Sequence, residues 1–338
     1  MSEGEESSER AISLVTGVAG FVASHLAERL LSQGHFVLGI DCFTDYYSRV
    51  IKQQNLEKLR AHPQFGFVEG DLLQLDLAAL LANPCENSMG LNGHIDYVFH
   101  LAAQAGVRAS WGRSFEIYTR NNILATQLLL EAAKQTSLKR FVYASSSSVY
   151  GDAETYPTPE SLTPHPVSPY GVSKLAGEHL CQLYWYNYRV PTVSLRYFTV
   201  YGPRQRPDMG FHKLIVALLQ NSEFEVYGNG EQTRDFTYVD DAVRGTIAAA
   251  LSDSVGEVFN IGGGSRVTLS QVIRHLESIL KQRAKVKYIA DQKGDVRHTA
   301  ADISKAQRLL RYTPSVPLVE GLARETRWLE QTAPALHR

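Results

Sequence analysis

The sequence is poor in cysteine and carries no excess of charge of either sign. Its 338 residues include three cysteines, Cys42, Cys85 and Cys181, which lie far apart and form no C-x-x-C pair. They exclude a disulfide framework and a zinc knuckle, so we expect no bound metal and a reducing, cytoplasmic location. Lys and Arg number 34 and Asp and Glu 35, for a formal net charge of −1. Because this balance offers no basic surface, we expect neither nucleic acid nor a membrane as partner.

Long apolar segments are absent as well. No apolar run approaches the roughly 18 residues that suggest a membrane-spanning helix. The first ten residues, MSEGEESSER, are acidic and polar, unlike the basic start of a secretion signal. Hydrophobic residues make up 44% and charged residues 20% of the chain, the composition of an ordinary folded protein. At this length we expect two domains or one large α/β unit.

Short apolar runs alternate with helical patterns over the first part of the chain. AISLV is followed by Val22, Leu26 and Leu30 at four-residue spacing and then by HFVLGID, which together form one βαβ unit. Further buried strands are expected at FGFVEGD, IDYVFHLAA, RFVYASSS, TVSLRYFTV and GEVFNIGG, with helices at NNILATQLLLEAAK and YGVSKLAGEHLCQLYWYNY. The pattern predicts an α/β fold with a Rossmann-like, doubly wound parallel sheet.

The pattern changes after Tyr201, where GPRQRPDMG forms a loop rich in glycine, proline and charge. Helices are expected at GFHKLIVALLQ, LSQVIRHLESIL and VEGLARETRWLEQ, with a strand at VKYIA. We therefore predict a Rossmann domain at residues 1–200, to which residues 236–264 return. Residues 201–235 and 265–338 would form a smaller α/β substrate domain.

The turn between the first strand and the first helix is rich in glycine. Gly17 and Gly20 stand in TGVAGFVA, where free backbone N–H groups and the helix dipole attract a pyrophosphate. Asp41 ends the second strand, where a carboxylate accepts hydrogen bonds from both ribose hydroxyls and repels a 2′-phosphate. The pattern therefore predicts NAD rather than NADP as cofactor. The alternative is a plain turn with a helix-capping aspartate.

Tyr170 and Lys174 are four residues apart at the start of a predicted helix and so share one face. A neighbouring ammonium and a nicotinamide cation would both lower the pKa of the tyrosine toward neutrality. The phenolate could then take the proton of a sugar hydroxyl while a hydride leaves the carbon that bears this hydroxyl. A surface tyrosine and lysine on an ordinary helix are the alternative.

Serines occupy residues 145–148, directly after the strand RFVYA. They are expected at the carboxyl edge of the sheet, where folds of this kind bind ligands. A hydroxyl there could hydrogen-bond the reacting oxygen and pass protons to Tyr170. A flexible serine loop is the alternative.

A set of short motifs runs in a fixed order along the chain. They are TGVAGFVAS, Asp41, EGD with Asp71, HLAA, Asn122, SSSSVYG, YGVSK, RYFTVYGP and RDFTYVDD. This set resembles the extended short-chain dehydrogenase/reductase family, sugar-nucleotide branch, over roughly Ala11 to Trp328. Within that branch, DCFTDYYSRVIKQQNLEKL, AAQAGVRAS and YFTVYGPRQRPDMG most resemble the UDP-glucuronic acid 4-epimerases.

The resemblance implies a role for individual residues. Tyr170 and Lys174 would be the catalytic pair, and Ser146 would assist at O4 of the sugar. The substrate-binding residues would be Ser147, Ser148, Thr199, Arg206, Lys213, Tyr227 and Arg234. The NAD-binding residues would be Gly17, Gly20, Phe21, Val22, Asp41, Asp71, Leu72, Leu101, Ala102, Ala103, Asn122, Tyr170 and Lys174.

The substrate-binding residues would divide the ligand among them. Ser147 and Ser148 would anchor a uronate carboxylate, and Arg206 would approach the sugar or the phosphates. Arg234 would hold the diphosphate bidentately, with Lys213 near the phosphates and Tyr227 stacked on uracil. For each of these cations, and above all for Arg206 and Lys213, an ordinary surface role is the alternative.

The chain departs from its relatives at several positions. Ala23 and Ala125 stand where glycines are usual, which affects the packing of a helix on a strand or on another helix. Gln292 replaces a second diphosphate arginine of hexose epimerases, and Thr299 replaces a tyrosine that limits the sugar site in some of them.

The sequence favours epimerisation among the reactions that follow oxidation at C4. Dehydratases of this family carry Thr-Asp-Glu where this chain has Ser146, Ser147 and Ser148, so the acid and base of dehydration are absent. We predict a NAD-dependent UDP-glucuronate 4-epimerase that forms UDP-galacturonate. The open alternatives are a UDP-glucuronate decarboxylase, a UDP-glucose 4-epimerase and a sensor without turnover. We also expect a homodimer through a four-helix bundle, because the helices around residues 121–134 and 174–188 are more apolar than one sheet face requires.

Overall fold

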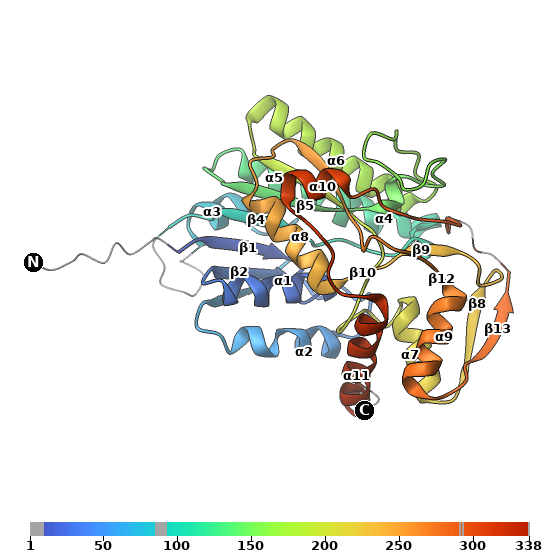
Figure 1. The fold of residues 1–338 in the computed structure, drawn as a ribbon. Coiled ribbons are helices and arrows are strands. Elements are labelled where there is room, and N and C mark those ends of the chain that lie inside the picture. The colour runs from blue at the N-terminus through green and yellow to red at the C-terminus, as the bar shows by residue number, and fades with distance from the viewer. Residues whose placement is uncertain (1–9, 85–92, 291, 293, 337–338) are drawn as a thin grey trace, which may run out of the picture.

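The computed structural model describes residues 10–84, 93–290, 292 and 294–336, and its centre is a seven-stranded sheet. All neighbouring strands in this sheet are parallel, which confirms the predicted fold class. Figure 1 shows the sheet crossing the molecule. Its strands, in spatial order, are β11 (Glu257–Ile261), β6 (Thr192–Tyr197), β5 (Arg140–Ser146), β4 (Tyr97–His100), β1 (Ile12–Thr16), β2 (Phe36–Asp41) and β3 (Phe65–Glu69).

Helices cover both faces of the sheet (Figure 1). One face carries α1 (Phe21–Ser32), α2 (Arg49–Arg60) and α8 (Val239–Leu251); the other carries α3 (Leu77–Ala82), α5 (Ala125–Ala133) and α6 (Pro169–Tyr188). Short turns of helix precede α5, namely η2 (Arg108–Ser110), η3 (Gly112–Ser114), α4 (Phe115–Tyr118) and the π-helix η4 (Thr119–Leu124). Every strand expected for this sheet is present. Helices α2, α3 and α8 were not predicted, since α2 is largely polar and α3 is short.

The remaining elements follow β6. They are β7 (Val200–Tyr201), α7 (Gly210–Leu219), β8 (Glu223–Tyr227), β9 (Thr233–Asp235), β10 (Thr237–Tyr238), β12 (Arg266–Thr268), α9 (Leu269–Leu280), β13 (Lys285–Ile289), α10 (Ser304–Leu310) and α11 (Leu318–Leu336). They include the predicted helices α7, α9 and α11 and the predicted strand β13, which pairs with β8. The division into a Rossmann domain and a substrate domain stays a proposal, to which the place of β11 in the central sheet lends support.

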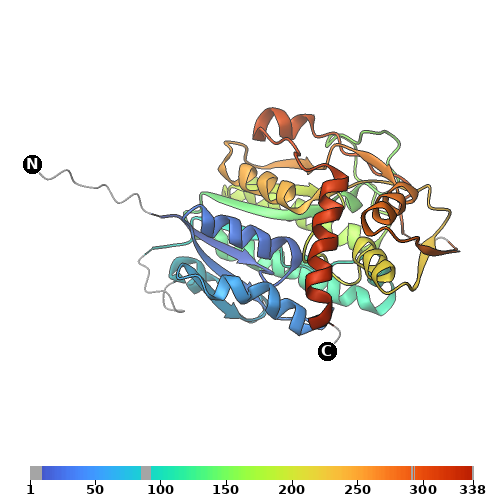
Figure 2. The ribbon, with the colours of Figure 1, turned by 60° about the horizontal axis from the view of Figure 1, so that its bottom comes forward.

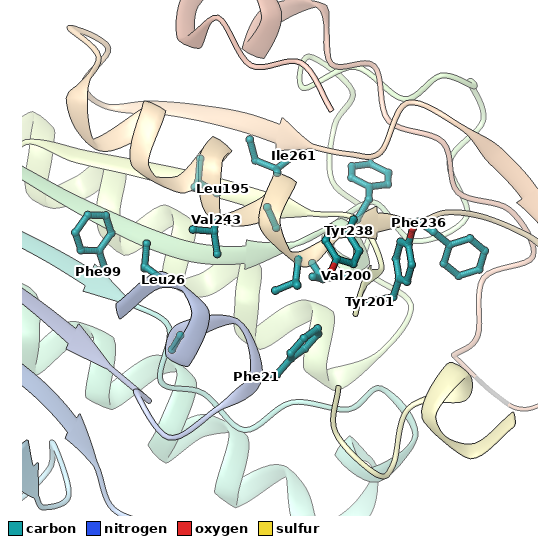
Figure 3. Packing of buried hydrophobic residues seen from close by; sticks show 14 of the residues in the cluster. Phe21, Leu26, Phe99, Leu195, Val200, Tyr201, Phe236, Tyr238, Val243 and Ile261 are labelled. Atoms are coloured by element: carbon teal, nitrogen blue, oxygen red, sulfur yellow. The ribbon is translucent and has the colours of Figure 1, made fainter. Parts of the chain in front are cut away.

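Aromatic side chains pack where the central sheet meets the elements that follow β6. Phe21 of α1 belongs to the same buried cluster as Val200, Tyr201, Phe236 and Tyr238 (Figure 3). The ring of Tyr201 lies 5.6 Å from that of Tyr238 and 6.3 Å from that of Phe236, in edge-to-face geometry. All five side chains are buried, so this packing joins α1 to the strands β7 and β10.

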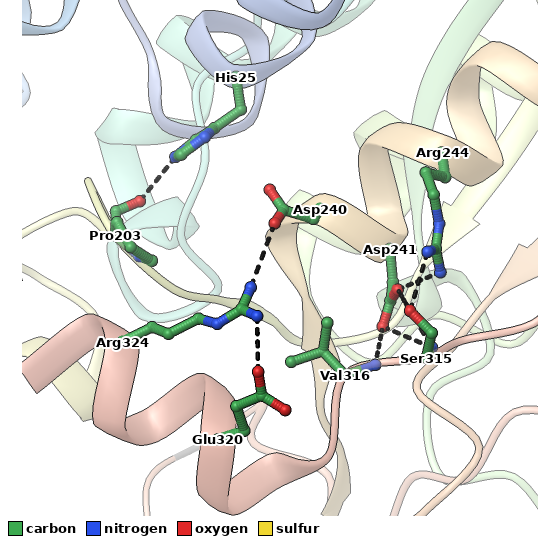
Figure 4. Close-up of polar contacts among 9 residues, drawn as sticks. All are labelled: His25, Pro203, Asp240, Asp241, Arg244, Ser315, Val316, Glu320 and Arg324. Atoms are coloured by element: carbon green, nitrogen blue, oxygen red, sulfur yellow. Dashed lines mark hydrogen bonds and ion pairs between the residues drawn. The ribbon is translucent and has the colours of Figure 1, made fainter.

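Polar contacts attach α11 to the rest of the molecule. Figure 2 shows this helix running across the molecule, and it packs against α7 and α9. The Asp241 carboxylate accepts hydrogen bonds from the backbone N–H groups of Ser315 and Val316 just before α11 (Figure 4).

His25 Nε2 of α1 lies 2.9 Å from the Pro203 carbonyl oxygen (Figure 4). Burial lowers the pKa of His25 to about 3, so a neutral imidazole holds the loop that follows β7.

Two of the three cysteines lie in the part of the chain that the structure describes. Cys42 is exposed and Cys181 is buried, and both are free thiols. Cys85 and the first nine residues lie outside the described ranges. Among the described helices, none has the length and apolar character needed to cross a bilayer.

Candidate active site

The glycine-rich turn predicted from the sequence joins β1 to α1. Gly17 has a φ of +69°, and a Cβ there would lie 2.8 Å from the Cα of Ala102 at the end of β4. Gly20 is the N-cap of α1 and provides no side-chain hydrogen bond to the first turn. The first N–H groups of α1 are therefore free to bind an anion such as a pyrophosphate. Glycine is required at Gly17 by the left-handed backbone and by contact with β4.

Asp41 lies at the carboxyl end of β2, beside this turn. Its carboxylate accepts hydrogen bonds from the N–H groups of Ala19 at 3.1 Å and Phe43 at 2.8 Å. Burial raises the pKa of Asp41, and these two hydrogen bonds oppose the rise. The carboxylate faces a cavity together with Gly17 and Gly20. A free helix N-terminus beside a hydrogen-bonded carboxylate fits the pyrophosphate and ribose of NAD.

One cavity of about 420 Å³, here named the Tyr170 cavity, begins at this turn. Apart from Asn122, every predicted NAD-binding residue lines it, as do Ser146, Ser147, Ser148, Thr199 and Arg206. It therefore joins the carboxyl ends of β1, β2, β4 and β5 to the start of α6, the edge at which parallel sheets bind ligands.

Tyr170 and Lys174 enter this cavity from the first turns of α6. The helix begins with Pro169 after the N-cap Ser168, whose hydroxyl accepts a hydrogen bond from the Gly171 N–H at 3.1 Å. The Lys174 ammonium donates to the Ala144 carbonyl oxygen at 2.8 Å. Burial lowers the pKa of Lys174 to about 7.

The pKa of Tyr170 is raised in the protein alone, whereas the predicted lowering also needs a bound nicotinamide cation and stays a prediction. Burial raises this pKa above its usual value, while the Ser146 hydroxyl and the Arg206 guanidinium act against the rise. Burial also reduces the charge that Lys174 carries near neutral pH. Lys174 alone therefore does not make the phenol acidic in the protein without cofactor.

Ser146 ends β5 and faces Tyr170. Its hydroxyl oxygen accepts a hydrogen bond from the Ser148 N–H at 3.1 Å, so its own proton is free to be donated. Ser145 is different, since its hydroxyl donates to the Glu178 carboxylate at 2.5 Å. The serines therefore form an ordered strand end and a 3₁₀ turn, η5 (Ser147–Val149), instead of a flexible loop.

Asn122 lies behind the cavity and not in its wall. The residue belongs to the π-helix η4 and is 1% exposed. Its amide oxygen accepts from the Gln104 N–H at 2.7 Å, and its amide nitrogen donates to the Gln104 carbonyl at 3.0 Å and to the Ser173 hydroxyl at 2.9 Å. Ser173 in turn donates to the Tyr170 carbonyl at 2.7 Å. Asn122 thus fixes the backbone that surrounds the cavity.

His100 continues this buried network toward β1. Thr126 donates its hydroxyl proton to the Asn122 carbonyl at 2.7 Å, so it accepts from His100 Nε2 at 3.0 Å. His100 Nδ1 then accepts from the Thr16 hydroxyl at 2.8 Å, and Thr16 accepts from the Ala102 N–H at 3.1 Å. Burial, and the charge of Lys174 to a smaller extent, lower the pKa of His100 to about 3. A neutral histidine therefore locks the ends of β1 and β4 together.

A second pocket of about 1150 Å³, here named the Tyr227 pocket, adjoins the first. It contains the predicted residues Lys213, Tyr227 and Arg234, together with Gln292. Tyr46, Gly106 and Val107 line both spaces, so the two are continuous. Thr299 lies outside both linings, where its hydroxyl accepts from the Asp235 N–H at 3.2 Å.

The sequence reading missed several residues of these two spaces. In the Tyr227 pocket, the Arg108 guanidinium lies 3.9 Å from the centre of the Tyr227 ring and pairs with Asp295 at 2.5 Å. In the Tyr170 cavity the missed residues include Tyr46, Tyr47 and Gln104. The segments DCFTDYY and AAQAGVRAS contain all of these residues except Asp295, and these segments already stood out by resemblance. Within the described ranges, no group of three or more His, Cys, Asp or Glu could hold a metal ion.

Comparison with known proteins finds a family to which most of the chain is similar. Residues 13–262 match the NAD dependent epimerase/dehydratase family. The chain belongs to this family. The match confirms the sequence-based assignment, and with it NAD as the cofactor.

Individual relatives cover almost the whole chain. A UDP-glucuronate 4-epimerase of Thermodesulfobacterium geofontis is 38% identical over 320 residues, which are 94% of this chain and 96% of the relative. The uncharacterized UDP-glucose epimerase YtcB of Bacillus subtilis is 44% identical over 94% of this chain and 97% of its own length. The crystal structure of a Bacillus cereus UDP-glucuronic acid 4-epimerase with UDP-glucuronic acid and NAD is 46% identical. Its TM-score is 0.89, over 95% of this chain and 99% of that one.

Proposed function

We propose that this protein is a UDP-glucuronate 4-epimerase, which interconverts UDP-glucuronate and UDP-galacturonate. The observation that carries the proposal is the continuity of the two spaces. Tyr170, Lys174 and Ser146 stand in the cavity that fits NAD, and Lys213 and Arg234 stand in the adjoining pocket. A sugar nucleotide is a ligand with a diphosphate at one end and a reactive sugar at the other. The relatives from T. geofontis and B. cereus favour the uronate as that sugar.

Tyr170 is the acid and base of the proposed reaction. NAD, when bound, supplies reversible oxidation of the sugar at C4. Tyr170 takes the proton of the 4-hydroxyl as the ketone forms and returns it when the ketone is reduced from the opposite face. Ser146, whose hydroxyl oxygen accepts from the Ser148 N–H, turns its proton toward Tyr170 and donates a hydrogen bond to the reacting oxygen. The Lys174 ammonium, in its charged form, favours the phenolate of Tyr170.

The other predicted residues hold the substrate. Arg234 and Lys213 bind the diphosphate, and Tyr227 stacks on the uracil ring. Burial lowers the pKa of Arg234, and its Nη1 atom donates to the carbonyl oxygens of Thr233 and Arg297. These bonds fix the guanidinium within the pocket before the phosphates arrive.

The carboxylate of a uronate needs separate control. Its 4-keto form is a β-keto acid, which loses carbon dioxide when the bond to the carboxylate aligns with the carbonyl π system. Ser147 and Ser148 follow the reacting serine directly, and Thr199 and Arg206 line the same cavity. Hydrogen bonds from these groups hold the carboxylate near the plane of the ring, which prevents that alignment.

Parallel incubations test the proposal. The purified protein receives UDP-glucuronate in one and UDP-glucose in another, both without added NAD, and the products are read by mass spectrometry and NMR. We expect UDP-galacturonate, with retained cofactor sufficient for turnover because it is regenerated in each cycle. A pentose nucleotide with carbon dioxide would instead identify a decarboxylase, and conversion of UDP-glucose alone a hexose epimerase. If neither sugar nucleotide gave a product, the remaining interpretation would be a binding protein without turnover.

We further propose that the protein works as a cytoplasmic homodimer. Apolar side chains of η4 and α6 are exposed, with exposed fractions of 45% for Leu124 and Val172, 53% for Leu183 and 76% for Tyr186. In a homodimer these apolar side chains would be buried against the same face of the second copy.

A further inference from the structure

An aspartate joins two loops at the boundary between the Tyr170 cavity and the Tyr227 pocket. Arg206 Nε donates to Asp208 Oδ1 at 2.9 Å, and Arg206 Nη2 donates to Asp208 Oδ2 at 3.0 Å. The Tyr46 hydroxyl, on the loop that follows β2, donates to Asp208 Oδ2 at 3.1 Å. Asp208 is thus a bridge between a loop of the NAD-binding half and the loop that follows β7.

The bridge determines which edge of the Arg206 guanidinium remains free. A guanidinium has two edges that bind a carboxylate bidentately, one with Nε and one with the two terminal nitrogens. Asp208 occupies the Nε edge, and Nη1 has no hydrogen-bond partner among the described residues. Arg206 lines the Tyr170 cavity, whereas Asp208 lines the Tyr227 pocket. The terminal nitrogens are therefore the donors that remain for a ligand.

Tyr46 is itself tightly placed. A Cβ on Gly106 would lie 2.5 Å from the Tyr46 hydroxyl, so this hydroxyl lies close against the Gly106 backbone. Gly106 is fixed from the other side, because the Tyr118 hydroxyl donates to its carbonyl oxygen at 2.8 Å. Tyr46 and Gly106 line both spaces. A ligand that spans the two spaces must pass Tyr46, and a shift of this ring would move Asp208.

Asp208 keeps its charge at neutral pH. Burial alone would raise the pKa of this carboxyl, but the Arg206 guanidinium and the Tyr46 hydroxyl hold it below its usual value. A charged carboxylate with three donors is a rigid anchor for the arginine, since a charge-assisted bidentate pair fixes both distance and plane.

We propose that Asp208 and Tyr46 are positioning residues that make Arg206 selective for an anionic sugar. They hold the guanidinium with its terminal nitrogens toward the sugar, where a uronate carboxylate gains a charge-assisted hydrogen bond and a neutral hexose does not. The inference rests on the proposed function and deepens it, because it names the residues that select a uronate nucleotide over a hexose nucleotide.

Equilibrium binding to the NAD-loaded protein tests this inference. Calorimetry measures the Kd of UDP-glucuronate and of UDP-glucose for the wild type, Asp208→Asn, Tyr46→Phe, Arg206→Gln and the double variant Arg206→Gln/Asp208→Asn. Asp208→Asn is expected to raise the Kd of UDP-glucuronate about tenfold or more and the Kd of UDP-glucose less than about twofold. Tyr46→Phe is expected to raise the Kd of UDP-glucuronate as well, by a smaller factor. In the Arg206→Gln background the second change should have no further effect, because Asp208 acts through the arginine.

Asp45→Asn is the matched control, since Asp45 is an exposed aspartate next to Tyr46 on the same loop. It should leave both Kd values unchanged. Equal weakening of both nucleotides by Asp208→Asn, or an undiminished effect without Arg206, would show a general structural role and overturn the inference. If wild-type protein prefers UDP-glucuronate through Asp208 but yields no UDP-galacturonate, the inference stands and the proposed activity fails. If it epimerises UDP-glucuronate while Asp208→Asn binds normally, only the inference fails.

Discussion

Glu178 of α6 and Arg196 of β6 form a buried, bidentate ion pair directly beneath the site. Arg196 Nη2 donates to Glu178 Oε2 at 2.7 Å, and Arg196 Nε donates to Oε1 at 2.9 Å. The side chains are 5% and 2% exposed. Ser145 also donates to this carboxylate, from the residue before Ser146. The pair therefore ties α6, the helix that carries Tyr170, to β6. Through Ser145 it also ties α6 to β5, the strand that leads into the serines.

The first prediction concerns this pair. Glu178→Gln leaves the Arg196 charge buried without a counter-ion, so we expect the free energy of unfolding to fall by about 3–5 kcal/mol. Urea unfolding measures the loss, and replacing both residues by methionine should restore most of it. Arg283→Gln is the control, because Arg283 is 91% exposed in its pair with Glu277 and should change stability by less than about 1 kcal/mol. An equally small loss for Glu178→Gln would contradict the structural role.

The second prediction concerns the acid and base. Tyr170→Phe keeps the ring and removes the hydroxyl that, in the proposed mechanism, accepts and returns the proton. We expect a folded protein that retains NAD and loses about two to four orders of magnitude in turnover. Steady-state kinetics and the absorbance of bound cofactor provide the two measurements. Near-normal turnover would remove Tyr170 from the mechanism.

The third prediction concerns the cofactor. Asp41→Ala removes the carboxylate that faces the Tyr170 cavity and that would repel a 2′-phosphate. We expect weaker NAD binding and a smaller preference for NAD over NADP, measured by titration of cofactor-free protein. Asp76→Ala is a suitable control because Asp76 only caps α3. An unchanged cofactor preference in Asp41→Ala would be evidence against the ribose assignment.

The fourth prediction is a pH dependence of stability. The pKa of Lys174 is about 7 in the folded protein and about 10.5 without burial, so between these values the unfolded chain binds one more proton. The free energy of unfolding should therefore rise with pH in this window, by up to about 1.4 kcal/mol per pH unit. The cost of burying the charge is fully present below pH 7 and disappears toward pH 10.

Comparison with Lys174→Met isolates this effect. The difference in unfolding free energy between wild type and Lys174→Met should be constant below about pH 6 and should change in favour of wild type from pH 7 to 9. Lys58→Met, at an exposed position of α2, provides the reference for a lysine without burial. A difference that does not vary with pH would mean that Lys174 remains charged in the folded protein.

The fifth prediction concerns assembly. Tyr186→Glu places a charge at the most exposed apolar side chain of α6, where it would be desolvated in a dimer. Light scattering at micromolar concentration should show a dimer for the wild type and a monomer for the variant. Val50→Glu makes the same kind of change on α2, away from that face, and should stay dimeric. A wild type that is monomeric throughout would refute the assembly.

The sequence alone was enough for the central sheet and for the parts of the site that are local. Short apolar runs, separated by segments with helical spacing, predict β1 to β6, because each run shows that its own residues are buried. The turn with Gly17 and Gly20, the carboxylate of Asp41 and the pair of Tyr170 and Lys174 are likewise short-range features whose place at the sheet edge follows from strand order.

Tertiary structure decided what depends on contacts between distant segments. The raised pKa of Tyr170 follows from burial in a cavity that several strands complete, which spacing along one helix does not reveal. Tyr46 and Asp208 are 162 residues apart, and their hydrogen bond exists only because two loops meet across the site. A periodic pattern records which face of a segment is buried, whereas the identity of the group opposite it is fixed by packing of the whole chain.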